Sequence, residues 1–174
     1  MKLIKRIAFA AAIIFGIVII VTLFLPSEAY VERSIVIKAP REVVFEQVND
    51  FRNWPKWSYW ILSDSTMKLS FDEKTKGEGA SYSWVSENMG SGNQSIVKCV
   101  PYDSIETKIH FQDQGYSKGY WKFEDEQNGT KVVWGFKFET GNNPLMRLFV
   151  PVIKKEVEKS FDQGLGNIKN NLEA

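Results

Sequence analysis

The residue types that carry acid–base, nucleophilic or metal chemistry are thinly spread along this chain. Its 174 residues include one histidine, His110, and one cysteine, Cys99. A tetrahedral zinc site draws several ligands from Cys and His, and a Ser–His–Asp triad needs a histidine that faces its serine. His110 belongs to an alternating strand that we expect to point it outward. The sequence therefore predicts no catalytic residue, no metal site and no cofactor.

The carboxylates form no evident acid–base pair. A buried carboxylate with a raised pKa could act as a general base, but the sequence singles out none. We interpret the candidates as helix caps and surface charges: Asp50, Asp64, Asp72, Glu73 and Asp162. The prediction is a protein without catalytic activity.

Aromatic side chains are the more informative group, because the chain holds 6 Trp, 6 Tyr and 12 Phe. Small-molecule sites are usually large, mostly apolar clefts with few polar groups. The residues that we expect to line such a cavity are Tyr82, Trp84, Phe111, Trp121, Phe123, Trp134, Phe136, Phe149, Ile153, Val157 and Phe161. The alternative is that they simply fill the core, where burying each contributes roughly 1.5–3 kcal/mol.

Three tryptophans in the segment FRNWPKWSYW form a separate group. Trp54, Trp57 and Trp60 are expected at the mouth of the cavity or among lipid headgroups, where Trp and Tyr are favoured. The alternative is a packed turn that caps the sheet.

The elements that must position these side chains follow from periodicity. We predict a strand over Tyr30–Ile37, a helix that opens at Ala39-Pro40 and ends near Asn49-Asp50, and about six strands from Met67 to Glu139. In the last of these, Val132, Trp134, Phe136 and Phe138 share one face. Such alternation indicates an antiparallel sheet with one wet face. A further turn is expected at Gly90, Gly92 and Asn93.

The last 30 residues carry one apolar stripe from Phe149 through Phe161 to Leu172 at spacings of three and four, which predicts a long amphipathic helix. A curved antiparallel sheet wrapped on this helix would bury both apolar faces. The expected fold class is therefore α+β.

A run of nineteen uncharged residues, Ile7–Leu25, precedes this domain. About 20 apolar residues cross a bilayer as a helix, and the basic residues Lys2, Lys5 and Arg6 would keep the N-terminus in the cytoplasm. We predict a single-pass anchor over residues 1–25, a tether over 26–29 and an extracytoplasmic domain over 30–174. A cleaved signal peptide is an alternative, since Ser27-Glu28-Ala29 has small residues at suitable spacings. A buried helix of the domain is another.

Charge excludes one class of partner. Without the three basic residues before the run, the chain has 19 Lys+Arg against 21 Asp+Glu. Such a slightly acidic domain lacks the basic surface that binds nucleic acid.

The segment VERSIVIKAPREVVFEQVNDFRNWPKWS resembles the opening of the SRPBCC superfamily, the START-like, helix-grip proteins often labelled polyketide cyclase/dehydrase. The matching pieces are Ala39-Pro40, Val43–Asp50 and Trp54-Pro55-Lys56-Trp57. Later pieces also look like the family: Gly79–Trp84, Gly129–Val132, Asn143–Leu145 and Phe161–Leu165. The resemblance implies a seven-stranded antiparallel sheet that grips the C-terminal helix, with a cavity between them.

These observations predict a membrane-anchored module that binds a hydrophobic small molecule or lipid. Two alternatives remain, because a fold of this kind carries many functions. One is a cyclase/aromatase-like enzyme acting on a polyketide-like substrate in the same cavity. The other is an interaction module at the membrane surface with a collapsed cavity. The sequence indicates no oligomeric state.

Overall fold

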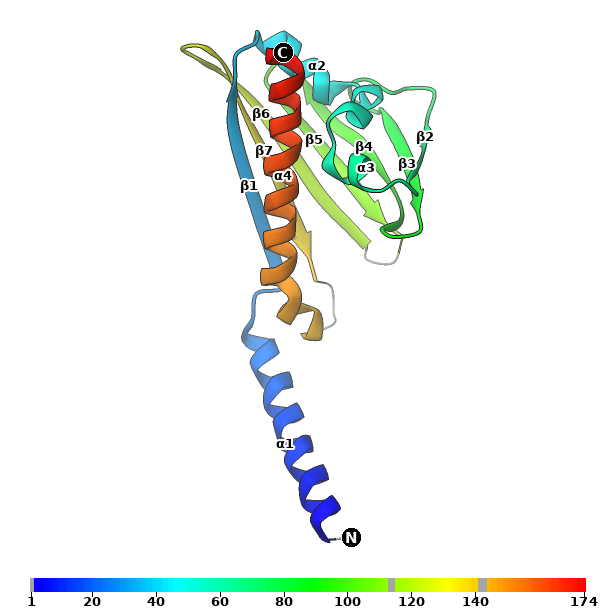
Figure 1. Cartoon of the computed structure of the whole chain (residues 1–174), viewed down its shortest axis with the longest axis vertical. Helices are drawn as coiled ribbons and strands as arrows, with labels where there is room; N and C mark the ends of the chain where they lie inside the picture. Colours follow the sequence, from blue (N-terminus) through cyan, green and yellow to red (C-terminus); the bar gives the residue numbers. More distant parts are fainter. Residues whose placement is uncertain (1, 113–114, 141–143) are drawn as a thin grey trace.

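The computed structural model describes residues 2–112, 115–140 and 144–174. An N-terminal helix α1 stands apart from a domain that begins with β1 and ends with a long helix α4 (Figure 1). The helical elements are α1 Lys2–Phe24, α2 Arg41–Asn49, the 3-10 helix η1 Phe51–Lys56, α3 Tyr59–Ser63, the 3-10 helix η2 Pro144–Phe149 and α4 Val150–Glu173. The strands are β1 Glu28–Ile37, β2 Lys68–Phe71, β3 Ser81–Ser86, β4 Gly90–Val100, β5 Ser104–Phe111, β6 Gly115–Glu126 and β7 Gly129–Glu139.

The seven strands form one antiparallel sheet in the order β1-β7-β6-β5-β4-β3-β2. Strands β2 to β7 follow one another as a meander, and β1 closes the edge beside β7. Helix α4 lies along β1 and across the inner face of the sheet (Figure 1). Arg33 on β1 ties the two together through ion pairs with Glu158 at 3.0 Å and Asp162 at 3.2 Å. The predicted helix-grip fold is confirmed.

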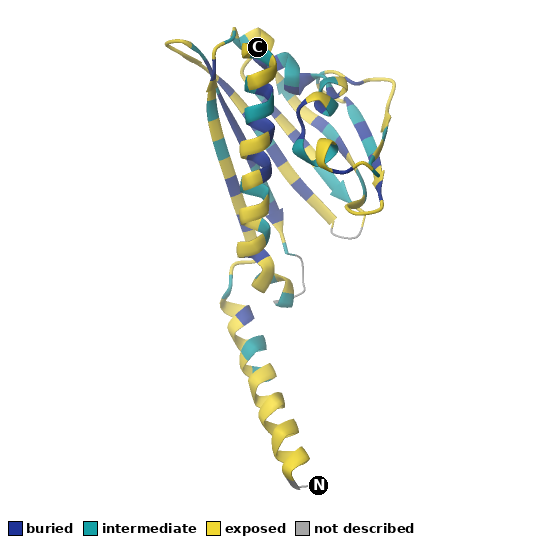
Figure 2. Cartoon of the chain, in the orientation of Figure 1, coloured by how far each residue is buried: buried dark blue, intermediate teal, exposed yellow. Residues whose placement is uncertain are grey.

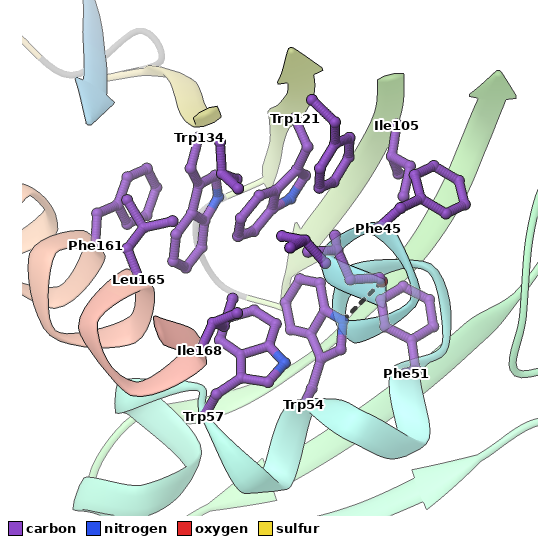
Figure 3. Close-up of a cluster of buried hydrophobic side chains, with 14 of the residues drawn as sticks. Phe45, Phe51, Trp54, Trp57, Ile105, Trp121, Trp134, Phe161, Leu165 and Ile168 are labelled. Carbon is purple, nitrogen blue, oxygen red and sulfur yellow. Dashed lines mark hydrogen bonds between the residues drawn. The ribbon is translucent and has the colours of Figure 1, made fainter. Parts of the chain in front are cut away.

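The core fills the half of the sheet that faces α2, η1 and the C-terminal part of α4 (Figure 3). Trp54 and Trp57 are buried there, and each indole N–H finds a main-chain carbonyl: Val48 at 3.0 Å and Gln47 at 2.9 Å. Buried Trp needs such a partner for its N–H. The Trp-Pro-Lys-Trp turn is thus packed in the core and hydrogen-bonded to the main chain of α2.

One predicted turn is wrong. Gly90, Gly92 and Asn93 lie inside β4, and the chain reverses just before them, at 87–89. Gly92 pairs with Trp84 of β3, and a Cβ at this glycine would overlap the Trp84 ring and the carbonyl of His110. A strand glycine often marks such a close approach rather than a turn.

Asp64, interpreted from the sequence as a cap or surface charge, is buried and caps a turn from inside. It accepts hydrogen bonds from the hydroxyl of Ser86, from the Thr66 hydroxyl at 2.6 Å and amide at 2.9 Å, and from Asn88 Nδ2 at 3.0 Å. The bonds from Ser86 and Thr66 hold the pKa of Asp64 well below its ordinary value of 3.8. The carboxylate therefore fastens the end of α3 to the β3–β4 turn.

Asp64→Asn is expected to lower the unfolding temperature at pH 7, because the amide cannot accept all of these bonds. Since the pKa is depressed in the folded state, the stabilisation is present above about pH 4 and is lost as the pH falls further. The difference in unfolding temperature between wild type and Asp64→Asn should therefore become smaller as the pH falls from 5 to 2. Glu87→Gln, an exposed change in the same turn, is the control. A difference in unfolding temperature that does not change with pH would contradict stabilisation by the ionised Asp64 carboxylate.

Helix α1 is exposed along most of its length (Figure 2). Within the described residues, Leu3–Phe24 is the one helix long and apolar enough to cross a membrane. Only a small share of it is buried, so α1 contributes little to the domain core.

A candidate binding cavity between the sheet and the C-terminal helix

A cavity of about 640 Å³ lies between the inner face of the sheet and the N-terminal half of α4. That volume falls within the range of about 300–1,000 Å³ that is usual for small-molecule sites. Its walls are mostly aromatic and aliphatic: Trp54, Ser58, Trp60, Ile61, Met67, Tyr82, Trp84, Met89, Gln94, Thr107, Ile109, Phe111, Ser117, Trp134, Phe136, Phe138, Glu139, Thr140, Met146, Ile153, Val157 and Phe161.

Strand alternation and helix periodicity build these walls. Thr107, Ile109 and Phe111 are alternate residues of β5, and Trp134, Phe136 and Phe138 are alternate residues of β7. Ile153, Val157 and Phe161 follow every four residues on α4 and close the opposite side. Side chains two apart on a strand, or four apart on a helix, share a face.

Most of the residues expected at the cavity lie on its wall. They are Tyr82, Trp84, Phe111, Trp134, Phe136, Ile153, Val157 and Phe161, together with Trp54 and Trp60 from the aromatic turn. At one edge of the wall, Trp134 stacks on Phe161 with ring centroids 3.7 Å apart.

Four of the expected residues are placed elsewhere. Trp121 and Phe123 face inward as expected, but α2 and η1 occupy that half of the concave face, so both are fully buried in the core. Trp57 is buried between Trp121 and Trp134 and faces neither a mouth nor a membrane. Phe149 is the last residue of η2 and precedes the first turn of α4, where it is exposed.

Sequence reasoning missed the polar part of the wall and its turn residues. Gln94 was overlooked because the preceding glycines suggested a turn instead of a strand. Thr107 was already on the inner face of its strand by alternation, which was a usable signal. Met67 belongs to the alternating segment MKLSF, which was a usable signal. Met89 lies in the turn before β4, where no periodicity identifies the side-chain direction.

Few polar groups reach the cavity, and they are uncharged except at one end. The Tyr82 hydroxyl donates to Gln94 Oε1 at 3.2 Å, and burial raises the pKa of this phenol, which keeps it protonated. Thr107 Oγ1 is buried with no hydrogen-bond partner in the described part of the chain. Thr107 Oγ1 lies against Gly119 and is closed off from the cavity, so the Tyr82–Gln94 pair is the group that could bind one or two oxygens of a bound molecule. Glu139 supplies a carboxylate at the end of β7.

The residues with the strongest intrinsic reactivity lie outside the cavity. The His110 ring stacks on Tyr116 with centroids 4.4 Å apart and is absent from the lining. Burial raises the pKa of the Cys99 thiol, which disfavours the reactive thiolate. No cluster of three or more His, Cys, Asp or Glu able to hold a metal occurs among the described residues.

A curved seven-stranded sheet that closes an apolar cavity against one long helix defines the helix-grip class of ligand-binding scaffold. The chain belongs to the family described as polyketide cyclase / dehydrase and lipid transport, whose sequence model matches residues 28–173.

Individual relatives agree with this assignment. A Streptomyces cyaneus protein named "Putative polyketide cyclase" is 25% identical over 116 residues, which cover 60% of this chain and 69% of that protein. Protein CV1439 from Chromobacterium violaceum has a similar structure, with a TM-score of 0.61, 16% identity and coverage of 86% of this chain and 99% of its own. The di-domain ARO/CYC BexL from the BE-7585A biosynthetic pathway has a TM-score of 0.64 at 14% identity, covering 85% of this chain and 51% of BexL. At these identities the solved structures share the fold alone.

Proposed function

We propose that this protein is a membrane-anchored module that binds a hydrophobic small molecule or lipid on the extracytoplasmic side. The observation that carries the proposal is the apolar cavity of about 640 Å³ with isolated hydroxyl and amide groups. Apolar walls provide affinity by removing the surface of the ligand from water. The hydroxyl of Tyr82 and the amide of Gln94 would fix its orientation.

Helix α1 supports the anchored part of the proposal. Its apolar side chains are exposed to solvent in the isolated chain, which is unfavourable unless lipid covers them. Lys5 and Arg6 lie at its N-terminal end, and positive residues favour the cytoplasmic side. That orientation puts the domain across the membrane.

A cyclase-type reaction is the second candidate, and Tyr82 is the specific observation that favours it. A buried, neutral phenol on the cavity wall could turn its hydrogen bond from Gln94 to a carbonyl of a polyketide-like substrate and so polarise that carbonyl. The family description and the name of the Streptomyces cyaneus relative point the same way. The interaction-only alternative required a collapsed cavity and is disfavoured by the open volume.

Native mass spectrometry of the full chain, released from a mild detergent after purification from host membranes, tests the proposal. We expect one discrete apolar species bound at one copy per chain, identifiable after extraction. A chain that is empty, and that also stays empty after incubation with a polyene fatty acid, would overturn the binding function. Recovery of an added polyketide-like compound in chemically changed form would favour the enzyme.

A further inference from the structure

Four exposed apolar side chains gather where η2 meets α4. Met146, Leu148, Phe149 and Val152 are 37%, 42%, 55% and 62% exposed, and we call them the apolar foot. They follow one another within seven residues of chain, at the end of the domain nearest α1 (Figure 1). Contiguous exposed apolar side chains mark surfaces that bind a protein or a membrane.

The apolar foot is fastened to the end of α1. Arg147, in the middle of the foot, donates from Nη1 to the carbonyl oxygens of Thr22, Leu23 and Leu25 at 3.2, 3.3 and 3.4 Å. Thr22 and Leu23 belong to the last turn of α1, where carbonyls lack amide partners four residues on, and Leu25 follows the helix. The Thr22 carbonyl also accepts from the Leu25 amide at 3.3 Å. The foot therefore lies at the same level as the C-terminal end of α1.

The short connection between α1 and β1 is also fixed. The Thr140 amide and hydroxyl both donate to the Ser27 carbonyl, at 2.8 and 3.1 Å. These hydrogen bonds, together with those of Arg147, fix the position and orientation of the domain relative to α1.

The length of α1 then determines the level of the foot. Its 23 residues span about 34 Å, close to the hydrocarbon thickness of about 30 Å. If α1 crosses the bilayer, its last turn lies at the lipid surface, and so does the apolar foot. Exposed Lys154 and Lys155 lie two and three residues after Val152 on α4, at the level where lipid phosphates would lie.

The cavity reaches the same end of the domain. Met146 belongs both to the apolar foot and to the cavity wall, and Glu139 and Thr140, at the end of β7, line the wall beside it. An apolar molecule that leaves the bilayer at the foot would therefore meet the cavity without crossing water.

We infer that the apolar foot rests in the outer surface of the bilayer that holds α1, and that the cavity receives its apolar ligand directly from that leaflet. This inference rests on the proposed function for the ligand, whereas contact between foot and bilayer can be measured without any ligand.

The contact is tested on the full chain in phospholipid nanodiscs. An environment-sensitive fluorophore is attached to Val152→Cys or to Asn170→Cys, in a Cys99→Ser background. Both positions are exposed on α4, and they lie about 27 Å apart along the helix. Lipids with a quencher near the headgroup should remove most of the fluorescence at 152 and leave position 170 unchanged. Equal quenching at the two positions, or quenching at neither, would overturn the inference that the apolar foot contacts the bilayer.

The route is tested by loading. A polyene fatty acid dissolved in the nanodisc bilayer should accept energy from the wall tryptophans as it enters the cavity. Leu148→Glu/Phe149→Glu should slow this loading at least about tenfold. Two carboxylates are unfavourable in the apolar part of the bilayer, so the foot of this variant no longer rests there. Val36→Glu/Val97→Glu carries the same charge change at exposed residues of the sheet and should load normally.

A second loading arm separates this inference from the proposed function. The same fatty acid, presented in detergent micelles without a bilayer, should load the foot variant and wild type alike. Unimpaired loading of the foot variant from nanodiscs would overturn the lateral route and leave the binding function intact. Loading of neither protein from either source would overturn the binding function.

Discussion

Trp57→Ala is expected to remove about 3–5 kcal/mol of stability, the usual cost of truncating a fully buried aromatic side chain. Trp57 has no exposed surface, and its ring lies 4.7 Å from that of Trp54 and 5.7 Å from those of Trp121 and Trp134. Its indole N–H donates to Gln47, and its carbonyl accepts from Asn167 Nδ2 at 3.0 Å. The Trp57 side chain thus joins α2 and the sheet, and its main-chain carbonyl binds α4.

The loss is measured by urea unfolding of the full chain in mild detergent, followed by far-ultraviolet circular dichroism. Trp60→Ala is the matched control, since Trp60 is only partly buried and lines the cavity. Its truncation should cost clearly less, because part of its surface already faces empty space. An equal loss of stability in Trp60→Ala and Trp57→Ala would contradict the prediction that the fully buried Trp57 contributes more.

The fold was predictable because its main signals are local. Alternation along Ile105–Phe111 and Lys131–Glu139, and the stripe from Phe149 to Leu172, each reveal an apolar face without knowledge of the partner. The start of β4 was not predictable in this way. Gly92 is a strand residue whose missing side chain leaves room for the Trp84 ring, a contact that leaves no mark in the local pattern.

The candidate site was predictable only to the level of a face. Alternation correctly puts Trp121 and Trp134 on the same face of the sheet, but it cannot say which part of that face another element covers. Helix α2 and the Trp-Pro-Lys-Trp turn cover Trp121, so that residue is core, while Trp134 borders the cavity. The border between packed and open parts depends on how α2 and η1 fold back.

Filling the cavity from both sides should abolish most binding. Ile109 on β5 and Val157 on α4 face the cavity from opposite walls, and both are partly exposed to it. Ile109→Trp/Val157→Trp adds two large rings to open space, so the protein can accommodate them at little cost to its stability. We expect the affinity for a polyene fatty acid to fall at least about tenfold, which corresponds to 1.4 kcal/mol.

Native mass spectrometry of the full chain, titrated with the fatty acid, gives the occupancy directly. The matched control is Lys108→Trp/Lys155→Trp, which places the same two rings on exposed residues one and two positions before the filled ones. The control should bind like wild type, because its rings point into solvent instead of the cavity. Equal losses in both double variants would indicate binding outside the cavity, whereas unchanged occupancy in the filled variant would show that the fatty acid does not occupy this space. Only the loss confined to Ile109→Trp/Val157→Trp agrees with a ligand held between the sheet and α4.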